Sequence, residues 1–304
     1  MERSLLVVCN GMARGGSTLQ YTLVRSLLDA TVGCTVHGYS SPNATHVQYM
    51  PVEKLLRWAA SPDYHVVKMH TAHPHARELL ANGRTKFCYI YRDLRDVAVS
   101  RQTAFGERGD VLLASLRKSE GEYHHLRELS RAFPEHFIWH RYEDTTRDLR
   151  SAALDGARLL SLSVTDEVAT AVAEACSVDA AKEKCDKQRA RLVAKVQAVR
   201  EENPRLAAEY LQAIGRGTVT QSIIEINNDS LLLYNHISPH QGASGVWDTR
   251  LSPTVRQQVM GQHREWLREL GYLAEADDDE RRQDNDGDTC AEDDARGVAL
   301  DTPL

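Results

Sequence analysis

A glycine-rich segment near the start of the chain has the spacing of a loop that binds phosphate. It reads Gly11-Met-Ala-Arg14-Gly-Gly-Ser-Thr18 and leads into a helical pattern. Backbone N–H groups and the dipole of a helix start favour an anion at such a place. Loops that hydrolyse nucleoside triphosphates carry Lys before the final Ser or Thr, but here that position is Ser17 and the cation is Arg14. The segment predicts a phosphate site of another kind, with a glycine turn that binds nothing as the alternative.

A second pair of polar residues suits a phosphate monoester. Arg92 ends an apolar run, and Ser100 lies on the helical pattern that follows it. Arginine supplies a planar bidentate cation and serine a hydroxyl donor. Taken alone, the segment is also consistent with a charged loop before an amphipathic helix.

Lys68 and His70 stand at the end of another apolar run. Parallel strands bring their C-terminal ends to the ligand crevice of an α/β sheet, so His70 is expected to face the same cleft as Arg14. A structural histidine is one alternative. A metal site made by His70, His73 and His75 is another, although a loop containing Pro74 is a poor preformed cage.

The elements that must position these residues alternate along the chain. Apolar runs predict strands at 4–9, 65–69, 86–91 and 136–139, and helical periodicity lies at 19–28, 52–60, 75–82, 96–105 and 112–133. Residues 149–214 have a helical pattern with breaks near 161–165 and 203–204, and 217–234 are suited to a hairpin. A glycine loop at 241–245 and a helix at 252–270, capped by Gly271, follow. The order predicts an α/β fold: a single domain, 1–274, with a central parallel sheet covered by helices on both faces, as in P-loop nucleotide kinases.

The charge of the chain divides into two parts. The 304 residues contain 37 Lys plus Arg and 43 Asp plus Glu, a net charge of −6, but residues 275–304 hold 12 acidic and 3 basic residues, which leaves +3 for residues 1–274. The 275–304 segment is therefore predicted to be a disordered acidic tail whose deletion leaves activity intact. The weakly basic body does not suggest nucleic acid as a partner.

The cysteines and the hydropathy pattern bear on the compartment. The six cysteines include no C-x-x-C pair, which favours reduced thiols. No apolar run approaches the ~18 residues of a membrane span, and the run at 5–9 is too short for a signal peptide. We therefore expect a cytoplasmic protein with no membrane partner, and the oligomeric state stays open.

The two phosphate motifs together resemble those of sulfotransferases that use 3′-phosphoadenosine 5′-phosphosulfate (PAPS). Arg14-Gly15-Gly16-Ser17-Thr18 resembles the family's 5′-phosphosulfate loop, and Tyr91 to Ser100 its 3′-phosphate signature, with Leu94 at a position where proline is common. Arg141-Tyr142-Glu143-Asp144 resembles a stretch whose tyrosine contacts adenine. Residues 240–247 resemble the closing loop Arg-Lys-Gly-x-x-Gly-x-Trp, with Gly242, Gly245 and Trp247 matching but His240 and Gln241 in place of the two cations.

The resemblance implies an activity and roles for these residues. The chain is expected to transfer a sulfuryl group from PAPS to a hydroxyl or amine, releasing the nucleotide product PAP. Lys68-Met69-His70 is similar to the segment that supplies the base, so His70 is the expected base. Lys68 is expected to meet the sulfonate oxygens, and Arg14 to stabilise the leaving phosphate. The donor-binding residues implied are Arg14, Gly15, Gly16, Ser17, Thr18, Arg92, Ser100, Tyr142, His240, Gln241 and Gly242, and this chemistry needs no metal.

The acceptor is the least determined part of this interpretation. Segments 40–48 and 206–234 fall between the nucleotide motifs and carry mixed polar and aromatic residues, which favours a small polar molecule. Two other functions stay open at this point. One is a P-loop phosphotransferase or nucleotide kinase, and the other is a scaffold that binds a nucleotide without catalysis.

Overall fold

The protein is described by a computed structural model that covers residues 5–46, 48–198, 200–216, 237 and 240–273. Two compact units, Met1–His263 and Arg264–Leu304, divide the chain. The predicted hairpin at 217–234 and acidic tail at 275–304 lie outside the described residues, so the domain boundary at 274 stays a prediction. No helix in the described part of the chain has the length and apolar character needed to cross a membrane.

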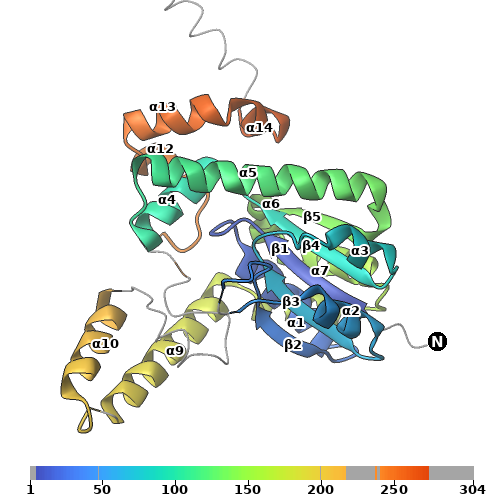
Figure 1. The fold of residues 1–304 in the computed structure, drawn as a ribbon, viewed down its shortest axis with the longest axis horizontal. Coiled ribbons are helices and arrows are strands. Elements are labelled where there is room, and N and C mark those ends of the chain that lie inside the picture. The colour runs from blue at the N-terminus through green and yellow to red at the C-terminus, as the bar shows by residue number, and fades with distance from the viewer. Residues whose placement is uncertain (1–4, 47, 199, 217–236, 238–239, 274–304) are drawn as a thin grey trace, which may run out of the picture. The chain divides into compact units, whose positions relative to one another are not determined.

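A five-stranded parallel sheet in the order β2-β3-β1-β4-β5 forms the centre of the first unit (Figure 1). The strands are β1 (Leu5–Gly11), β2 (Thr35–Tyr39), β3 (Tyr64–Met69), β4 (Thr85–Tyr91) and β5 (Phe137–Arg141). β1 is central and buried along its whole length, pairing with β3 on one side and β4 on the other. Every strand therefore points its C-terminal end to the same edge of the sheet.

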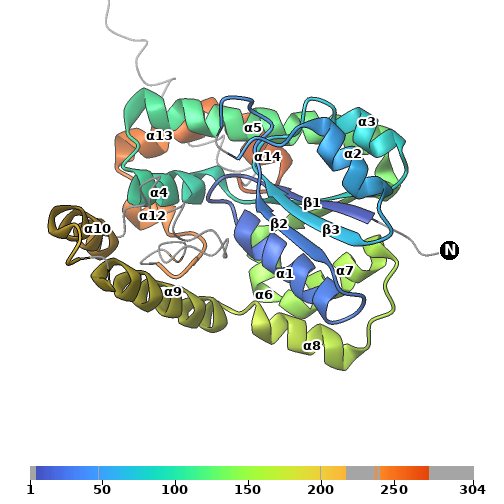
Figure 2. The same ribbon diagram turned by 60° about the horizontal axis from the view of Figure 1, so that its bottom comes forward.

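Helices cover both faces of the sheet (Figure 2). On one face, alternate β1 residues Leu5, Val7 and Cys9 pack with α1 (Ser17–Asp29) and α7 (Leu149–Leu160) in one buried cluster. The other face carries α2 (Val52–Ala60), α3 (Ala76–Ala81) and the long α5 (Gly109–Ala132). Because side chains alternate between the two covered faces, residues 5–9 of β1 are apolar at every position.

The remaining helices extend from this core. They are α4 (Leu94–Phe105), η1 (Pro134–His136), α6 (Tyr142–Arg147), α8 (Asp166–Ala175), α9 (Val178–Ala198), α10 (Pro204–Arg216), α12 (Trp247–Arg250) and α13 (Pro253–Gln262). Helices α9 and α10 share a small apolar cluster of their own, which includes Leu192, Val196 and Ala207. In the second unit α14 (Arg264–Glu269) is followed by Gly271, whose φ of 69° is a left-handed conformation that glycine adopts without strain.

The α/β class, the parallel sheet and its covering on both faces are confirmed. All four predicted strands are present, but a fifth, β2, was missed. The Tyr142 stretch forms the short helix α6, which the sequence did not predict. The prediction of a single helix at 252–270 is wrong, because the helix is interrupted at His263, between α13 and α14.

Candidate active site

The glycine-rich segment forms a tight turn between β1 and α1. Arg14 has a φ of 71° and Gly16 one of 99°, both left-handed. A Cβ atom at Gly16 would collide with the ring of Tyr142, and one at Gly15 would lie 2.7 Å from Cβ of Met12. The loop therefore needs glycine at both positions, because the backbone must pass close to its neighbours. Gly16 is the first residue before α1 and offers no side-chain cap, so the first N–H groups of the helix stay available to an anion.

Lys68 reaches this helix start from the neighbouring strand. Its position pairs with Cys9 in the sheet, and its Nζ donates a hydrogen bond of 2.7 Å to Oγ1 of Thr18. Burial and the nearby Arg14 guanidinium lower the pKa of Lys68 to about 7. A buried ammonium attracts an anion strongly because solvent screens its charge little.

His70 follows the end of β3 and is held by the main chain of the loop. Its Nδ1 lies 3.0 Å from the carbonyl oxygen of Gly11. A carbonyl can only accept a hydrogen bond, so Nδ1 carries the proton and Nε2 keeps its lone pair. Burial and the charge of Lys68 lower the pKa of His70 to about 3, which keeps the ring neutral. On its other side, the ring of Tyr39 lies 5.2 Å from the ring of His70.

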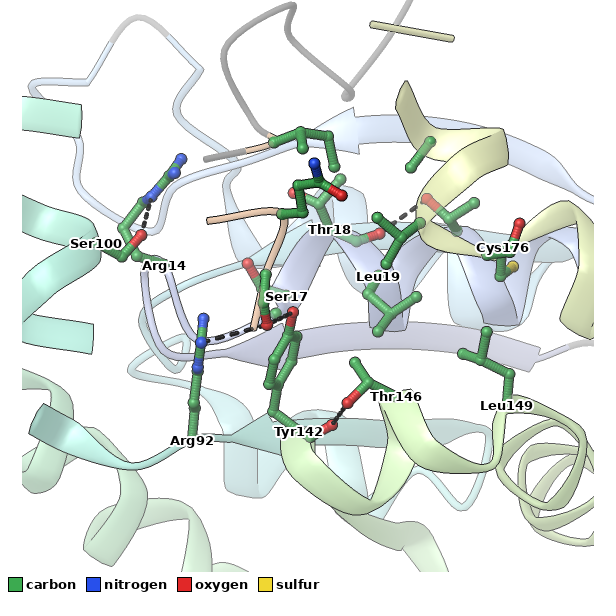
Figure 3. A pocket seen from close by; sticks show the side chains of 18 of the residues that line it. Arg14, Ser17, Thr18, Leu19, Arg92, Ser100, Tyr142, Thr146, Leu149 and Cys176 are labelled. Atoms are coloured by element: carbon green, nitrogen blue, oxygen red, sulfur yellow. Dashed lines mark hydrogen bonds between the residues drawn. The ribbon is translucent and has the colours of Figure 1, made fainter. Parts of the chain in front are cut away.

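Arg14 crosses from the loop to the second phosphate motif. Its Nε donates a hydrogen bond of 3.0 Å to Oγ of Ser100 on α4 (Figure 3). Burial and the charge of Arg92 lower the pKa of Arg14 to about 10. The guanidinium of a residue in the phosphate loop therefore lies beside Ser100 of the second phosphate motif.

Arg92 lies at the end of β4 with 6% of its surface exposed. Its guanidinium carbon is 4.3 Å from the centre of the Tyr142 ring, and its Nη2 donates to the carbonyl oxygen of Ala243 over 2.6 Å. Its buried Nε has no hydrogen-bond partner among the described residues. Tyr142 in turn donates from its hydroxyl to the carbonyl oxygen of Gly242 over 2.9 Å.

These side chains line one cavity of about 510 Å³. Eleven of the predicted residues contribute to its wall: Arg14, Gly16, Ser17, Thr18, Lys68, His70, Arg92, Ser100, Tyr142, Gln241 and Gly242. Gly15 shapes the loop without lining the cavity, and His240 lines a small hollow next to it, together with Arg92 and Ser100. The parts of the molecule that the sequence motifs singled out are thus brought to one place.

The other end of the cavity is mostly apolar, although Ser177 and Lys184 also line the cavity, and sequence reasoning missed it. Figure 3 shows Leu19, Leu149 and Cys176 on the side away from Arg14 and Arg92. The apolar wall residues are Leu19, Leu149, Ala175, Cys176, Val178, Ala181 and Ile237. Leu19 directly follows the phosphate loop and could have been found from that position, whereas the residues between α8 and α9 belong to no motif.

The geometry suits an anionic ligand with one apolar group. Arg14, Arg92 and the start of α1 can bind phosphate oxygens, and Nε2 of neutral His70 can accept a proton near them. The Nε of Arg92, which has no partner within the described part of the chain, and the close approach of the glycine loop fit a phosphorylated nucleotide. Among the described residues no group of three or more His, Cys, Asp or Glu side chains is arranged to hold a metal ion. The rings of His73 and His75 turn to Met50 and Glu78 instead.

Comparison with known proteins gives both a family and a set of similar folds. A family model described as the sulfotransferase domain matches residues 7–207. Mouse sulfotransferase SULT7A1 in complex with PAP superposes with a TM-score of 0.52 at 12% identity, over 88% of this chain and 85% of that one. No curated protein matches the sequence.

Retinol dehydratase is similar in two solved complexes. The complex with retinol and PAP has a TM-score of 0.54 at 16% identity, over 88% of this chain and 82% of that one. The complex with androsterone and inactive cofactor PAP has a TM-score of 0.51 at 15% identity, over 88% of this chain and 81% of that one. At these identities the likeness shows a shared fold.

Proposed function

The chain belongs to the sulfotransferase family, and we propose that it transfers a sulfuryl group from PAPS to a hydroxyl or amine of a small acceptor. One observation carries the proposal: a single cavity joins the phosphate loop, the Arg14, Arg92 and Ser100 cluster, and a histidine held neutral. A nucleotide kinase would need a lysine in the loop at the position of Ser17.

The two ends of the cavity would bind different parts of PAPS: the phosphates at one end and the nucleobase at the other. The 5′-phosphosulfate would lie at the start of α1, near Arg14 and the amides of residues 16–18, while the N–H of Gly15 donates to the carbonyl oxygen of Met12. The 3′-phosphate would lie on Arg92 and Ser100. The nucleobase would lie against Tyr142 and the apolar wall, because a planar ring gains from leaving water there.

His70 is the proposed base for the transfer step. As the acceptor attacks sulfur in line, a bond forms between its oxygen or nitrogen and sulfur, and the bond from sulfur to the bridging phosphate oxygen breaks. Nε2 of His70 takes the acceptor proton, since Gly11 fixes the proton on Nδ1. An anion bound beside Lys68 and Arg14 raises the pKa of His70 from its low resting value, which makes the ring a better base.

Arg14 and Lys68 would stabilise the charge that develops as the bond breaks. Negative charge builds on the bridging oxygen, which leaves with PAP, and on the oxygens of the transferring group. Cations held in a buried site act strongly on such charge because they need little reorganisation. Cationic side chains and backbone amides are sufficient for this step.

The acceptor would enter on the His70 side. Tyr39 lies against His70, and the ring of His46 lies 5.8 Å from that of Tyr39, so the entrance carries hydrogen-bonding aromatic groups. This supports a small acceptor with polar groups. The described cysteines are free thiols, which supports a reducing, cytoplasmic compartment.

Two measurements test the proposal. Calorimetric titration with PAP must show saturable binding at micromolar concentration. Incubation with PAPS and a mixed panel of phenols, amines and sugars must then add the mass of one sulfonate to at least one compound. Absence of PAP binding would overturn the proposed function.

A further inference from the structure

The first turn of α4 contacts the glycine loop at 240–247 through a buried carboxylate. Asp96 has 1% of its surface exposed. Its Oδ2 accepts a hydrogen bond of 2.7 Å from the backbone N–H of Gly245, and its Oδ1 one of 3.1 Å from that of Trp247. Both carboxylate oxygens of Asp96, on α4, therefore accept hydrogen bonds from a loop that is distant in the sequence.

Arg92 lies four residues before Asp96, ahead of α4, and its guanidinium contacts carbonyl groups of the same loop. Its Nη2 donates to Ala243 over 2.6 Å and lies 3.4 Å from the carbonyl oxygen of Gly242. The same Nη2 is 3.8 Å from Oδ2 of Asp96. The arginine and the carboxylate thus hold the acceptors and the donors of the loop respectively, and each orients the other.

Capping of α4 does not account for Asp96. The N-cap of this helix is Asp93, whose side chain accepts from the backbone N–H of Arg95. In a capping box the third helical residue would accept from the N–H of the N-cap residue, but that N–H donates to Glu143 here. The carboxylate of Asp96 therefore serves the loop and not its own helix.

The glycine loop at 240–247 contributes backbone and amide groups, and no charged side chain, to the wall of the cavity. Gln241 and Gly242 line the cavity, and His240 lies beside Arg92 in the adjoining hollow. Neither Gln241 nor Gly242 carries a charge, so what they contribute depends on where their backbone and amide groups lie. The contacts to Asp96 and Arg92 constrain this position, together with the hydrogen bond from Tyr142 to Gly242.

We propose that Asp96 is a positioning residue for nucleotide binding: by holding the N–H groups of Gly245 and Trp247 it fixes the loop, and with it the guanidinium of Arg92, against the nucleotide. Asp96 itself does not touch the ligand. The inference rests on the proposed function, since it assumes that the cavity binds PAP.

The test compares Asp96→Asn with Asp148→Asn, the same change at an exposed helix N-cap that holds the N–H of Ser151. Asparagine keeps one accepting oxygen, so one of the two loop donors loses its partner. We expect affinity for PAP to fall about tenfold to hundredfold in Asp96→Asn, as for a buried polar group left unsatisfied, and to stay unchanged in Asp148→Asn. Calorimetry with PAP measures both.

Hydrogen exchange supplies a readout that general loss of stability does not give. In Asp96→Asn at least one of the amides of Gly245 and Trp247 should exchange faster, while the amides of β1 and β4 keep their protection. A loop-side variant, Gly245→Ala, covers the case in which Asp96→Asn does not fold. Its φ of 76° strains alanine although nothing lies within 4 Å of the new Cβ. Gly83→Ala, with a φ of 71° and equally open space, is its control.

Weaker PAP binding together with faster loop exchange supports the inference. Unchanged PAP affinity in both Asp96→Asn and Gly245→Ala overturns it, as does unchanged exchange at both Gly245 and Trp247 in the asparagine variant. If the unmodified protein does not bind PAP, the proposed function fails and the positioning role fails with it, whereas loop exchange still shows whether Asp96 anchors the loop.

Discussion

The two ends of the cavity are built differently. One end carries cations from turns and strand ends at the edge of the sheet: Arg14, Arg92 and Lys68. The other end carries apolar residues in or next to helices that are far apart in the chain: Leu19, Leu149 and Cys176. The first group needs orientation, because a hydrogen bond to a phosphate weakens quickly with angle. The second needs only apolar area. Contacts that depend on orientation are therefore made at the sheet edge, which we call the directed end of the cavity. Apolar contacts that need little orientation are made by the helices, which we call the tolerant end.

The largest expected effect is on turnover in His70→Ala. Removal of a general base lowers the rate by about a hundredfold to ten-thousandfold, and PAP affinity should change little because the ring binds Gly11 and not phosphate. Transfer rates with an acceptor found in the screen, and calorimetry with PAP, measure the two. His136→Ala is the matched control, since that ring also contacts a backbone carbonyl, 2.7 Å away at Thr85, but at the opposite edge of the sheet. Full turnover in His70→Ala would move the base elsewhere.

Arg92→Ala should have the next largest effect, and on binding. Truncation of a buried, hydrogen-bonded charge costs about 2–5 kcal/mol, or at least about thirtyfold in affinity for PAP. Arg147→Ala provides the contrast, because that side chain is 76% exposed and pairs with Asp144 at the surface. Equal PAP affinity in the two variants would show that the sheet edge does not bind the nucleotide through its cations.

The lowered pKa of Lys68 predicts how the affinity for PAP depends on pH. Its pKa of about 7 means that the ammonium loses its proton as the pH rises through neutrality. An anion binds the charged form better, so affinity should fall above pH 7, at most about tenfold per pH unit. Titrations from pH 6 to 9 should show this fall in the unmodified protein and a flat profile over the upper range in Lys68→Met. The same fall in both proteins would assign it to another group.

The sheet edge could be predicted from the sequence because its residues lie in short continuous segments. Arg14 and Thr18 belong to one loop, and Lys68 and His70 to one strand end, so residue type and spacing record the chemistry. Their placement in one cavity follows from parallel strands that end at a common edge. What each residue does in catalysis stays a prediction.

The missed elements share a physical reason. β2 is a short edge strand with Val36 38% exposed and Gly38 at a φ of 71°, so neither burial nor regular alternation marks it. The apolar wall of the cavity is assembled by tertiary packing of residues at the end of α8 and the start of α9 with Leu19 and Leu149. An apolar residue that lines a cavity and one that fills a core look the same in a sequence.

The smallest expected effect concerns this apolar wall. Leu19→Ala should weaken PAP binding only about threefold to tenfold, the cost of losing part of one apolar contact. The loss should vanish when ribose 3,5-bisphosphate replaces PAP, because that probe lacks the nucleobase and keeps both phosphates. Leu159→Ala, a half-buried leucine packed against the α1 core away from the cavity, is the control for general loss of stability. If Leu19→Ala weakened the two ligands equally, the leucine would act through the neighbouring phosphate loop, and the division of the cavity into a directed end and a tolerant end would fail.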